Sequence, residues 1–235
     1  MARSYGQHCG VSTALELVGE RWALLIVRDL LVGPRRFTDL RQGLGVPTNI
    51  LSTRLKELQE AGVVRRAHLA HCGLVYELTE FGRELEDVVL SLCRWGFQAL
   101  GEPGPQDVLT ADALTITLRS AFRPEIAAAL PPTRYELHLD GLGLSVATSG
   151  DALAVRPVAS NRPTDPAGSP PEPDLVIRTG PSIYRLIGGE LSAEAAVLDG
   201  LAGLAPMRVD LLDRFTRTFQ LPRRSASPDL KPTLA

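Results

Sequence analysis

The sequence predicts an α+β protein, with an N-terminal winged helix-turn-helix domain and a C-terminal α+β domain that contains an antiparallel sheet. Residues 37–78 hold two helical patterns, a short break and two β-rich runs. Residues 135–158 alternate apolar and polar side chains between turn signals, as in an antiparallel meander. The segment GEPGPQ at residues 101–106 interrupts helix and strand alike. We therefore expect domains at residues 1–100 and 108–222, followed by a flexible tail at residues 223–235.

The N-terminal half has the order of elements that a helix-turn-helix requires. Helices are expected at residues 11–18, 21–32 and 37–43, and a turn at residues 44–47. The next helix has Leu51, Leu55 and Leu58 on one stripe, with the spacing of a buried helical face. Pro47 suits its first helical position, and Gly62 suits its C-terminal end.

A hairpin and a long apolar helix follow the second helix of the motif. The strands are expected at residues 63–69 and 74–78, with the hairpin tip near Cys72 and Gly73. Thr79 can cap a helix that runs to about Phe97. Its apolar residues are Leu85, Val88, Val89, Leu92 and Trp95. This surface exceeds what a small winged domain needs, so it indicates a homodimer seam, or alternatively packing against the second domain.

The C-terminal half alternates between strands and short helices. Helices are expected at residues 111–122, 182–186, 193–198 and 211–219, and strands at residues 135–139, 142–148, 152–158 and 174–179. Residues 161–173 are rich in proline and predict an exposed loop.

Composition narrows the class of protein and its compartment. The chain has 235 residues, of which 44% are hydrophobic and 22% charged, as in ordinary globular proteins. No apolar run approaches the roughly 20 residues that span a bilayer, and the N-terminus lacks the apolar core of a secretory signal. Three cysteines, an odd number, disfavour a disulfide scaffold. We expect a cytoplasmic protein without a membrane role.

Charge is distributed unevenly along the chain. The formal net charge is -2, yet residues 35–66 have seven basic and three acidic side chains, a net charge of +4. Residues after Gly101 have 13 basic and 16 acidic side chains, a net charge of -3. The positive charge therefore coincides with the helix-turn-helix, where phosphate contacts are expected.

Polar side chains opposite the leucine stripe are the candidates for contact with double-stranded DNA. Hydroxyl and amide groups can read base edges, and lysine can pair with phosphate. These residues are Thr48, Asn49, Ser52, Thr53 and Lys56. Further candidates are Arg35 and Arg36 before the first helix of the motif, Arg54, and Arg65, Arg66 and His68 on the wing. The alternatives are a solvated helix face, a plain exposed hairpin and, for Arg54, a brace inside the motif.

Other chemistry has weaker support in the sequence. Cys9 is a candidate redox thiol beside His8, and the alternative is a small apolar residue. His68, His71 and Cys72 provide three side chains, one fewer than a closed zinc site needs, so no metal is expected. Hydrolase-elbow and phosphate-loop motifs are absent from the sequence. We expect neither enzyme activity nor a cofactor.

Several separated motifs resemble the HxlR-type winged-helix regulators. They are YGQHCGVSTALELVGERWALLIVRDLLVGPRRFTDLRQGL, ILSTRLKELQEAGVVRR and YELTEFGREL, in that order, between about Tyr5 and Trp95. The resemblance implies a homodimer that binds pseudo-palindromic DNA near promoters. Two features depart from the family pattern, because Gly10 rather than proline follows Cys9, and the wing tip at residues 70–73 has no proline.

The segment PDLVIRTGPSIYRLIGGELSAEAAVLDGLAGL is similar to sterol-carrier-like domains, which implies an apolar pocket under a curved sheet. Candidates to line it, or simply to form the core, are Leu137, Leu139, Leu144, Val146, Val155, Val176 and Ile177. We expect a dimeric DNA-binding transcriptional regulator that responds to an apolar small molecule. The alternatives are a ligand carrier or interaction module whose winged helix contacts protein, and a thiol-based regulator that senses oxidants through Cys9.

Overall fold

The computed structural model describes residues 4–70, 73–104, 107–158 and 172–221. Contacts divide the chain into two units, Met1–Ser91 and Leu92–Ala235. The helix at Glu86–Phe97 is continuous through this boundary, and the domain limits expected from the sequence remain a prediction. The expected tail at residues 223–235 lies outside the described residues. Within the described part of the chain, no helix is both long and apolar enough to cross a membrane.

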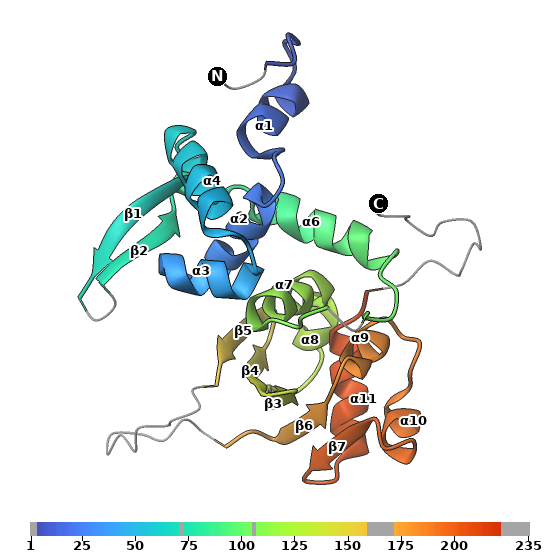
Figure 1. The fold of residues 1–235 in the computed structure, drawn as a ribbon. Helices are drawn as coiled ribbons and strands as arrows, with labels where there is room; N and C mark the ends of the chain where they lie inside the picture. The colour runs from blue at the N-terminus through green and yellow to red at the C-terminus, as the bar shows by residue number, and fades with distance from the viewer. Residues whose placement is uncertain (1–3, 71–72, 105–106, 159–171, 222–235) are drawn as a thin grey trace. The chain divides into compact units, whose positions relative to one another are not determined.

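The first unit is a winged helix-turn-helix, which confirms the predicted fold of this region (Figure 1). Its helices are α1 (Gly10–Val18), α2 (Ala23–Val32), α3 (Phe37–Leu44), α4 (Thr48–Glu60) and α5 (Glu80–Arg83), and its strands are β1 (Val64–Leu69) and β2 (Gly73–Leu78). The helix α4 packs against α1, α2 and β1. It is therefore held from behind by the rest of the unit.

The turn between α3 and α4 is set by backbone conformation. Gly45 follows α3 with φ +63°, a left-handed conformation that glycine adopts without steric cost. The sequence suggested that Pro47 is the first residue of α4. The structure instead has Pro47 as the N-cap, in an extended conformation with ψ 142°. At the other end, Gly62 has φ +70° just beyond the C-cap Ala61. The predicted glycine stop is confirmed.

The wing is an antiparallel hairpin with a third, very short strand. Register runs from Val64 opposite Leu78 to Leu69 opposite Gly73. Arg35 forms an isolated antiparallel bridge with Tyr76, with backbone N–O distances of 3.0 and 2.7 Å. This bridge fixes the start of α3 to the wing. Of the expected tip residues, Cys72 lies outside the described residues and Gly73 begins β2.

The single helix predicted from Thr79 to Phe97 is two helices, α5 and α6 (Glu86–Phe97). The Thr79 hydroxyl accepts a hydrogen bond from the Gly82 amide at 3.0 Å, which confirms the predicted cap. Gly82 passes so close to β1 that a Cβ there would lie 2.1 Å from the Val63 carbonyl oxygen. The helix is interrupted after this tight first turn, at Glu84 and Leu85. Hydrophobic periodicity does not predict such an interruption, because the apolar spacing continues across it.

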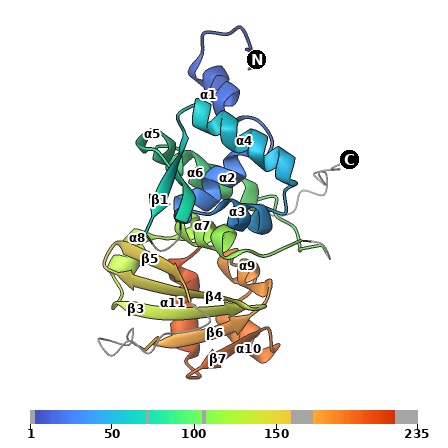
Figure 2. The ribbon, with the colours of Figure 1, turned by 60° about the vertical axis from the view of Figure 1, so that its left-hand side comes forward.

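The second unit is a five-stranded sheet with helices. It contains α7 (Ala111–Ala121), α8 (Pro124–Ala128), β3 (Thr133–Leu139), β4 (Leu142–Ser149), β5 (Ala152–Pro157), β6 (Leu175–Thr179), α9 (Ser182–Ile187), α10 (Ala193–Leu198), β7 (Ala202–Ala205) and α11 (Val209–Thr218). Figure 2 shows α11 behind the strands of the sheet. The strand order is β5-β4-β3-β6-β7. This α+β architecture confirms the predicted class.

The sheet is mixed, so the prediction of an antiparallel sheet was wrong in one pairing. β3 pairs with β4 in antiparallel register, and β4 pairs with β5 in the same way, which matches the expected meander. β6, however, lies on the other side of β3 and runs parallel to it. The chain between β3 and β6 includes β4 and β5, so it is long enough for the crossover that a parallel pair requires.

The hydrophobic core of the second unit lies on one face of this sheet. Tyr135 packs edge-on against Phe215 of α11, with ring centroids 5.3 Å apart. Five of the seven candidate pocket residues are fully buried in this core, namely Leu137, Leu139, Leu144, Val146 and Ile177. Val155 is half-buried beside them. Val176 points to the opposite face from Ile177, because neighbouring residues of a strand alternate, so the seven residues do not line one pocket.

Candidate nucleic-acid interface

The helix α4 separates its apolar and polar residues onto two faces. Leu51, Leu55 and Leu58 are fully buried beneath it. Five of the six candidate contact residues of this helix are exposed, namely Thr48, Asn49, Ser52, Thr53 and Lys56, and Arg54 is half-buried. Ile50 is also exposed on α4, although it is not among the residues predicted from the sequence. The unit therefore presents hydroxyl, amide and ammonium groups on a helix whose other side is fixed in the core.

Local interactions leave most of this polar face available. The Thr53 hydroxyl donates to the Asn49 carbonyl at 3.0 Å, which still leaves the hydroxyl oxygen as an acceptor. Lys56 lies 3.7 Å from Glu60 in an ion pair whose side chains are both well exposed. Exposed pairs of this kind contribute little energy, roughly 0–1 kcal/mol, so a phosphate can compete for the lysine.

Arg54 differs from its neighbours because it is held inside the unit. Its guanidinium pairs with Glu57 and, at 3.6 Å, with Glu20 before α2. The side chain is only 14% exposed, and its Nε is buried without a hydrogen-bond partner in the described structure. Of the two roles that the sequence left open, this geometry favours the internal brace. Glu20 lies 34 positions earlier, so helical spacing within α4 carried no signal for it.

On the wing, each predicted arginine has a partner on β2. Arg65 pairs with Glu77 at 2.8 Å. The guanidinium of Arg66 stacks over the ring of Tyr76, 5.4 Å from its centroid, with Nε 3.3 Å from the phenol oxygen. Cross-strand register places Arg66 directly opposite Tyr76, a partner that cannot be read from the sequence without the hairpin register. His68 is exposed farther along β1.

The two arginines before α3 are placed differently. Arg35 is half-buried, and its guanidinium donates to the Pro34 carbonyl at 3.1 Å. Arg36 is exposed at the N-cap of α3, where its backbone amide donates to the Asp39 carboxylate at 3.1 Å. That carboxylate occupies one of the helix N-terminal donors that could otherwise bind phosphate.

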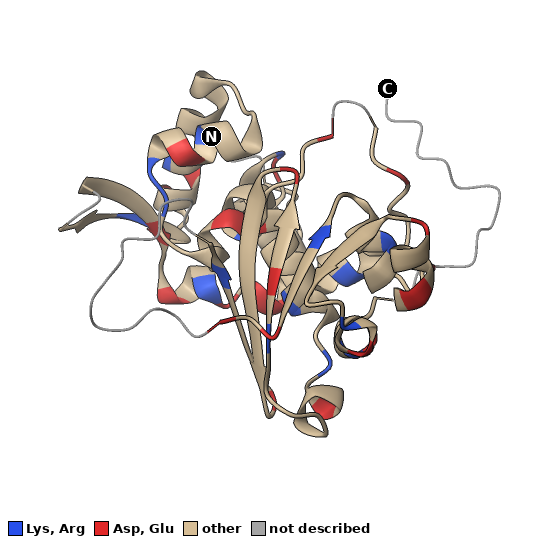
Figure 3. Ribbon diagram, turned by 90° about the horizontal axis from the view of Figure 1, so that it is seen from below, with Lys and Arg blue, Asp and Glu red and all other residues tan. Residues whose placement is uncertain are grey.

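Ion pairing moderates the positive charge of this region. Arg54, Lys56 and Arg65 each lie within 4 Å of a carboxylate. Acidic and basic residues are interspersed along the ribbon in Figure 3. At least three of the seven basic side chains at residues 35–66 therefore have an acidic partner, which reduces the unpaired positive charge of this segment.

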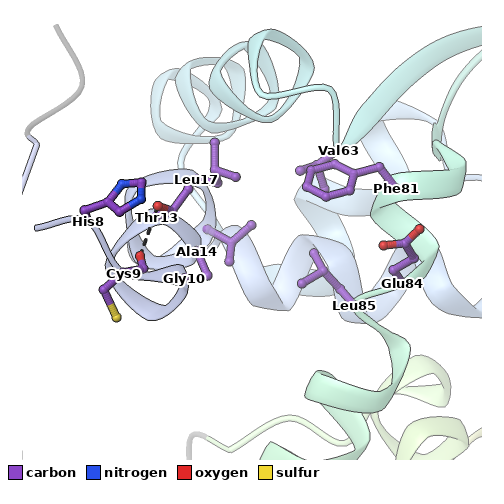
Figure 4. Close-up of a pocket in the computed structure, with 11 residues that line it drawn as sticks. His8, Cys9, Gly10, Thr13, Ala14, Leu17, Val63, Phe81, Glu84 and Leu85 are labelled. Atoms are coloured by element: carbon purple, nitrogen blue, oxygen red, sulfur yellow. Dashed lines mark hydrogen bonds between the residues drawn. The ribbon is translucent and has the colours of Figure 1, made fainter.

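Cys9 is the N-cap of α1 and is exposed. Backbone amides of Ser12 and then Val11 lower the pKa of its thiol, since they donate hydrogen bonds to the thiolate. It lies at the edge of a cavity of about 560 Å³ whose apolar walls include Leu17, Phe81 and Leu85. Figure 4 shows its sulfur directed away from the space between α1 and these residues. No group of three metal-ligating residues occurs among the described residues, which exclude His71 and Cys72.

The helix α6 leaves an apolar stripe uncovered. Val88, Leu92 and Trp95 are 47%, 44% and 74% exposed, with the i, i+4, i+7 spacing of one helical face. Val89 and Phe97, on the other side, are buried. The helix therefore contributes to the core and also presents apolar surface to solvent.

Comparison with known proteins places the winged helix in a family. Residues 17–103 match the family described as HxlR-like helix-turn-helix. The uncharacterized HTH-type transcriptional regulator Rv3095 of Mycobacterium tuberculosis is 45% identical over 101 residues, which are 40% of this chain and 62% of that protein. The HTH-type transcriptional regulator YodB of Bacillus subtilis is 34% identical over 97 residues, which are 40% of this chain and 86% of that protein.

Among solved structures, the redox regulator HypR in its oxidized form is 31% identical and covers 40% of this chain and 100% of its own, with a TM-score of 0.36. The matched segment of this chain thus spans less than two thirds of the mycobacterial relative and most of YodB. Residues 17–103 match the HxlR-like helix-turn-helix model, and the match to YodB, at 34% identity, covers 86% of that protein. This chain therefore belongs to the HxlR-like helix-turn-helix family.

Proposed function

We propose that this protein is a homodimeric transcriptional regulator that binds pseudo-palindromic double-stranded DNA through α4. The observation that carries the proposal is the division of α4 into a buried leucine face and an exposed face of Thr48, Asn49, Ser52 and Thr53. An α-helix with such a face fits the major groove, where amide and hydroxyl groups distinguish base edges. Lys56, Arg36 and the wing residues Arg65, Arg66 and His68 would contact flanking phosphates or the minor groove.

The uncovered stripe of α6 supports the dimer. Val88, Leu92 and Trp95 resemble one side of a helix pair, and a second copy of the same helix would cover them. A two-fold axis through this pair would relate two α4 helices. Dimeric helix-turn-helix proteins place such helices about 34 Å apart, which is one turn of DNA.

DNA binding can be tested by fluorescence anisotropy with a fragment from upstream of the protein's own gene, over a salt series. Asn49→Ala and Ser52→Ala should weaken specific binding by about 10-fold or more each, because each removes a base contact worth about 1–3 kcal/mol. Lys56→Ala should make the slope of log affinity against log salt concentration shallower by about one, as expected for the loss of one phosphate contact. Arg156→Ala is the matched control, because it removes an exposed cation from β5. It should change neither the affinity for DNA nor its salt dependence.

Two outcomes would contradict the DNA proposal. Binding that does not weaken with salt would show that phosphates do not take part. Absence of binding to any duplex, with the fold intact, would favour a winged helix that contacts protein. In that case the chain would be a ligand carrier or an interaction module.

A second candidate function, thiol-based control through Cys9, is favoured by one observation. This thiol is exposed, and two backbone amides at the start of α1 lower its pKa, so more of it is thiolate near neutral pH than in an ordinary cysteine. Thiolates react with oxidants and electrophiles. Modification there would alter α1, which packs against α4.

Cys9→Ser separates the two functions. The variant should bind DNA as the unsubstituted protein does but should no longer lose or gain binding after treatment with diamide. The alkylation rate of Cys9 should reach half its maximum at a lower pH than that of a peptide of residues 4–14, which lacks the folded α1. An unchanged diamide response in Cys9→Ser would remove the thiol proposal and leave the DNA proposal intact.

A further inference from the structure

A cavity of about 570 Å³ lies in the second unit, away from the sheet residues that the sequence proposed as a pocket. Its walls come from the last turn of α6, residues 100–103 and 107–109, α7 and α9 (Ser182–Ile187). The size is within the range of about 300–1,000 Å³ that small-molecule sites occupy. The core beneath the sheet is filled with side chains, so this cavity is the better candidate for a ligand.

Apolar side chains form most of the cavity wall. Phe97 and Tyr184 pack against each other with ring centroids 6.3 Å apart. Leu100 and Val108, which also line the cavity, are 44% and 79% exposed. Large apolar side chains left in solvent around a concavity are typical of a binding site without its occupant.

One cation, Arg185, stands in this wall without a counter-charge. It is half-buried on α9, and within the described part of the chain its guanidinium has no ion pair or hydrogen bond. Two carboxylates also line the cavity, but Glu102 and Asp107 are exposed at its edge. The Asp107 carboxylate accepts a hydrogen bond from the Gly104 amide at 2.7 Å. Partial burial of an unpaired guanidinium is unfavourable, whereas solvated carboxylates need no partner.

We propose that this cavity binds an anionic amphiphile, with a carboxylate head group held by Arg185 and an aliphatic tail against Phe97, Leu100, Val108 and Tyr184. A guanidinium can bind a carboxylate through two parallel hydrogen bonds, and a tail would cover the exposed leucine and valine. The binding itself does not depend on the proposed function of α4. A role as effector does, because the occupant would contact the end of α6, the helix proposed for the dimer.

Cys93 of α6 also lines the cavity and gives a direct probe of its occupancy. In a Cys9→Ser/Cys72→Ser variant, Cys93 is the remaining thiol. Dodecanoate, below its micelle concentration, should slow the alkylation of Cys93 in a saturable way. Dodecanol and dodecyltrimethylammonium have the same tail with a neutral and a cationic head group, and they should protect far less at equal concentration.

Arg185→Gln should weaken dodecanoate binding about 10-fold or more, because it removes a charge-assisted pair. Arg178→Gln, which removes an exposed arginine on β6 outside the cavity wall, should leave the affinity unchanged. Isothermal titration of dodecanoate into the unsubstituted protein gives the same affinity without cysteine variants. Equal affinity for the three head groups, an unaffected Arg185→Gln variant, or no heat and no protection would each overturn the proposal. Because no DNA is present, these outcomes are independent of the result for α4.

Discussion

The two units of the chain bury their apolar residues in different ways. In the first unit, α4 buries three leucines and turns a polar face outward, and the wing directs arginines away from the core. In the second, a sheet and its helices enclose a large cluster that includes the packed rings of Tyr135, Phe215 and Phe219. The candidate DNA-contact residues of the first unit therefore lie on an outer surface, whereas the candidate ligand-binding residues of the second unit line a cavity at the edge of its core.

This difference shows where functional residues can be sought in each unit. A recognition surface requires exposed polar side chains on a rigid support, and α4 meets that requirement directly. A ligand site requires space, and close-packed cores contain little of it. The sheet residues Leu137 and Leu144 are therefore structural, while Arg185 and Leu100, at the border of the cluster, are candidates for binding.

The largest expected effects come from removing a matched leucine in each unit. Leu55→Ala in α4 and Leu118→Ala in α7 should each lower the free energy of unfolding by about 3 kcal/mol, because both side chains are fully buried and leave a cavity. Hydrogen exchange followed by mass spectrometry would locate the loss. We expect faster exchange in Met1–Ser91 for the first variant and in Leu92–Ala235 for the second.

Faster hydrogen exchange throughout the chain in either variant would contradict this expectation, because it would show that the two units unfold together. Conservative Leu55→Met and Leu118→Met variants are the controls. They keep most of the side-chain volume and should cost less than about 1.5 kcal/mol.

The sequence predicted the first unit well because its signals are local. The leucine spacing of α4, Gly45 and Gly62 at helix ends and the Thr79 cap each depend on residues a few positions apart. Long-range partners were missed for the same reason. Glu20 reaches Arg54 only through the packing of the unit, and Tyr76 meets Arg66 only once the hairpin register is known.

In the second unit, the strands β3 to β6 were predictable from the sequence, but the pairing of β6 and the existence of β7 were not. Alternation in β3 and β4 is visible in the sequence, but nothing local indicates that β6 joins β3 in parallel. β7 is Ala202–Ala205, with the sequence Ala-Gly-Leu-Ala, and it contains no β-branched or aromatic residue of the kind that favours strands. α8 is five residues long and begins at Pro124, too short for a helical period to be detected.

A pH titration should distinguish the second unit through Tyr135. Burial raises the pKa of this phenol to about 12, and its oxygen has no hydrogen-bond partner in the described structure. Below about pH 10 both states keep the proton, so the phenol adds no pH dependence there. Between about pH 10 and 12 the unfolded chain releases the proton while the folded chain retains it, so stability falls by up to about 1.4 kcal/mol per pH unit.

Urea unfolding of the unsubstituted protein and of Tyr135→Phe across this range measures the effect. The variant loses no hydrogen bond, so the two proteins should have similar stability near pH 8 and diverge above about pH 10. The difference should reach about 2 kcal/mol at pH 12, where the folded phenol is itself half ionised. If the free energy of unfolding depended on pH in the same way in both proteins, the phenol would not be protected from ionisation in the folded state.

The smallest expected difference compares two threonine caps. Thr79 accepts from the Gly82 amide and also donates to the Gly62 carbonyl at 2.6 Å, so it joins α5 to the end of α4. Within the described residues, the Thr110 hydroxyl has a single hydrogen bond, which it accepts from the Ala113 amide at 3.1 Å at the start of α7. Thr110→Ala should cost about 1 kcal/mol and Thr79→Ala about 2 kcal/mol, because the second loses a tertiary hydrogen bond as well as a cap.

Serine at either position keeps the hydroxyl and should restore most of the lost stability, which separates hydrogen bonding from the loss of the methyl group. Urea unfolding of the four variants, with hydrogen exchange to assign each change to its unit, provides the measurement. Equal costs for the two alanine variants would mean that the bond from Thr79 to Gly62 contributes nothing net. The first unit would then rely on the leucines of α4, and not on this link, to hold the recognition helix against the wing.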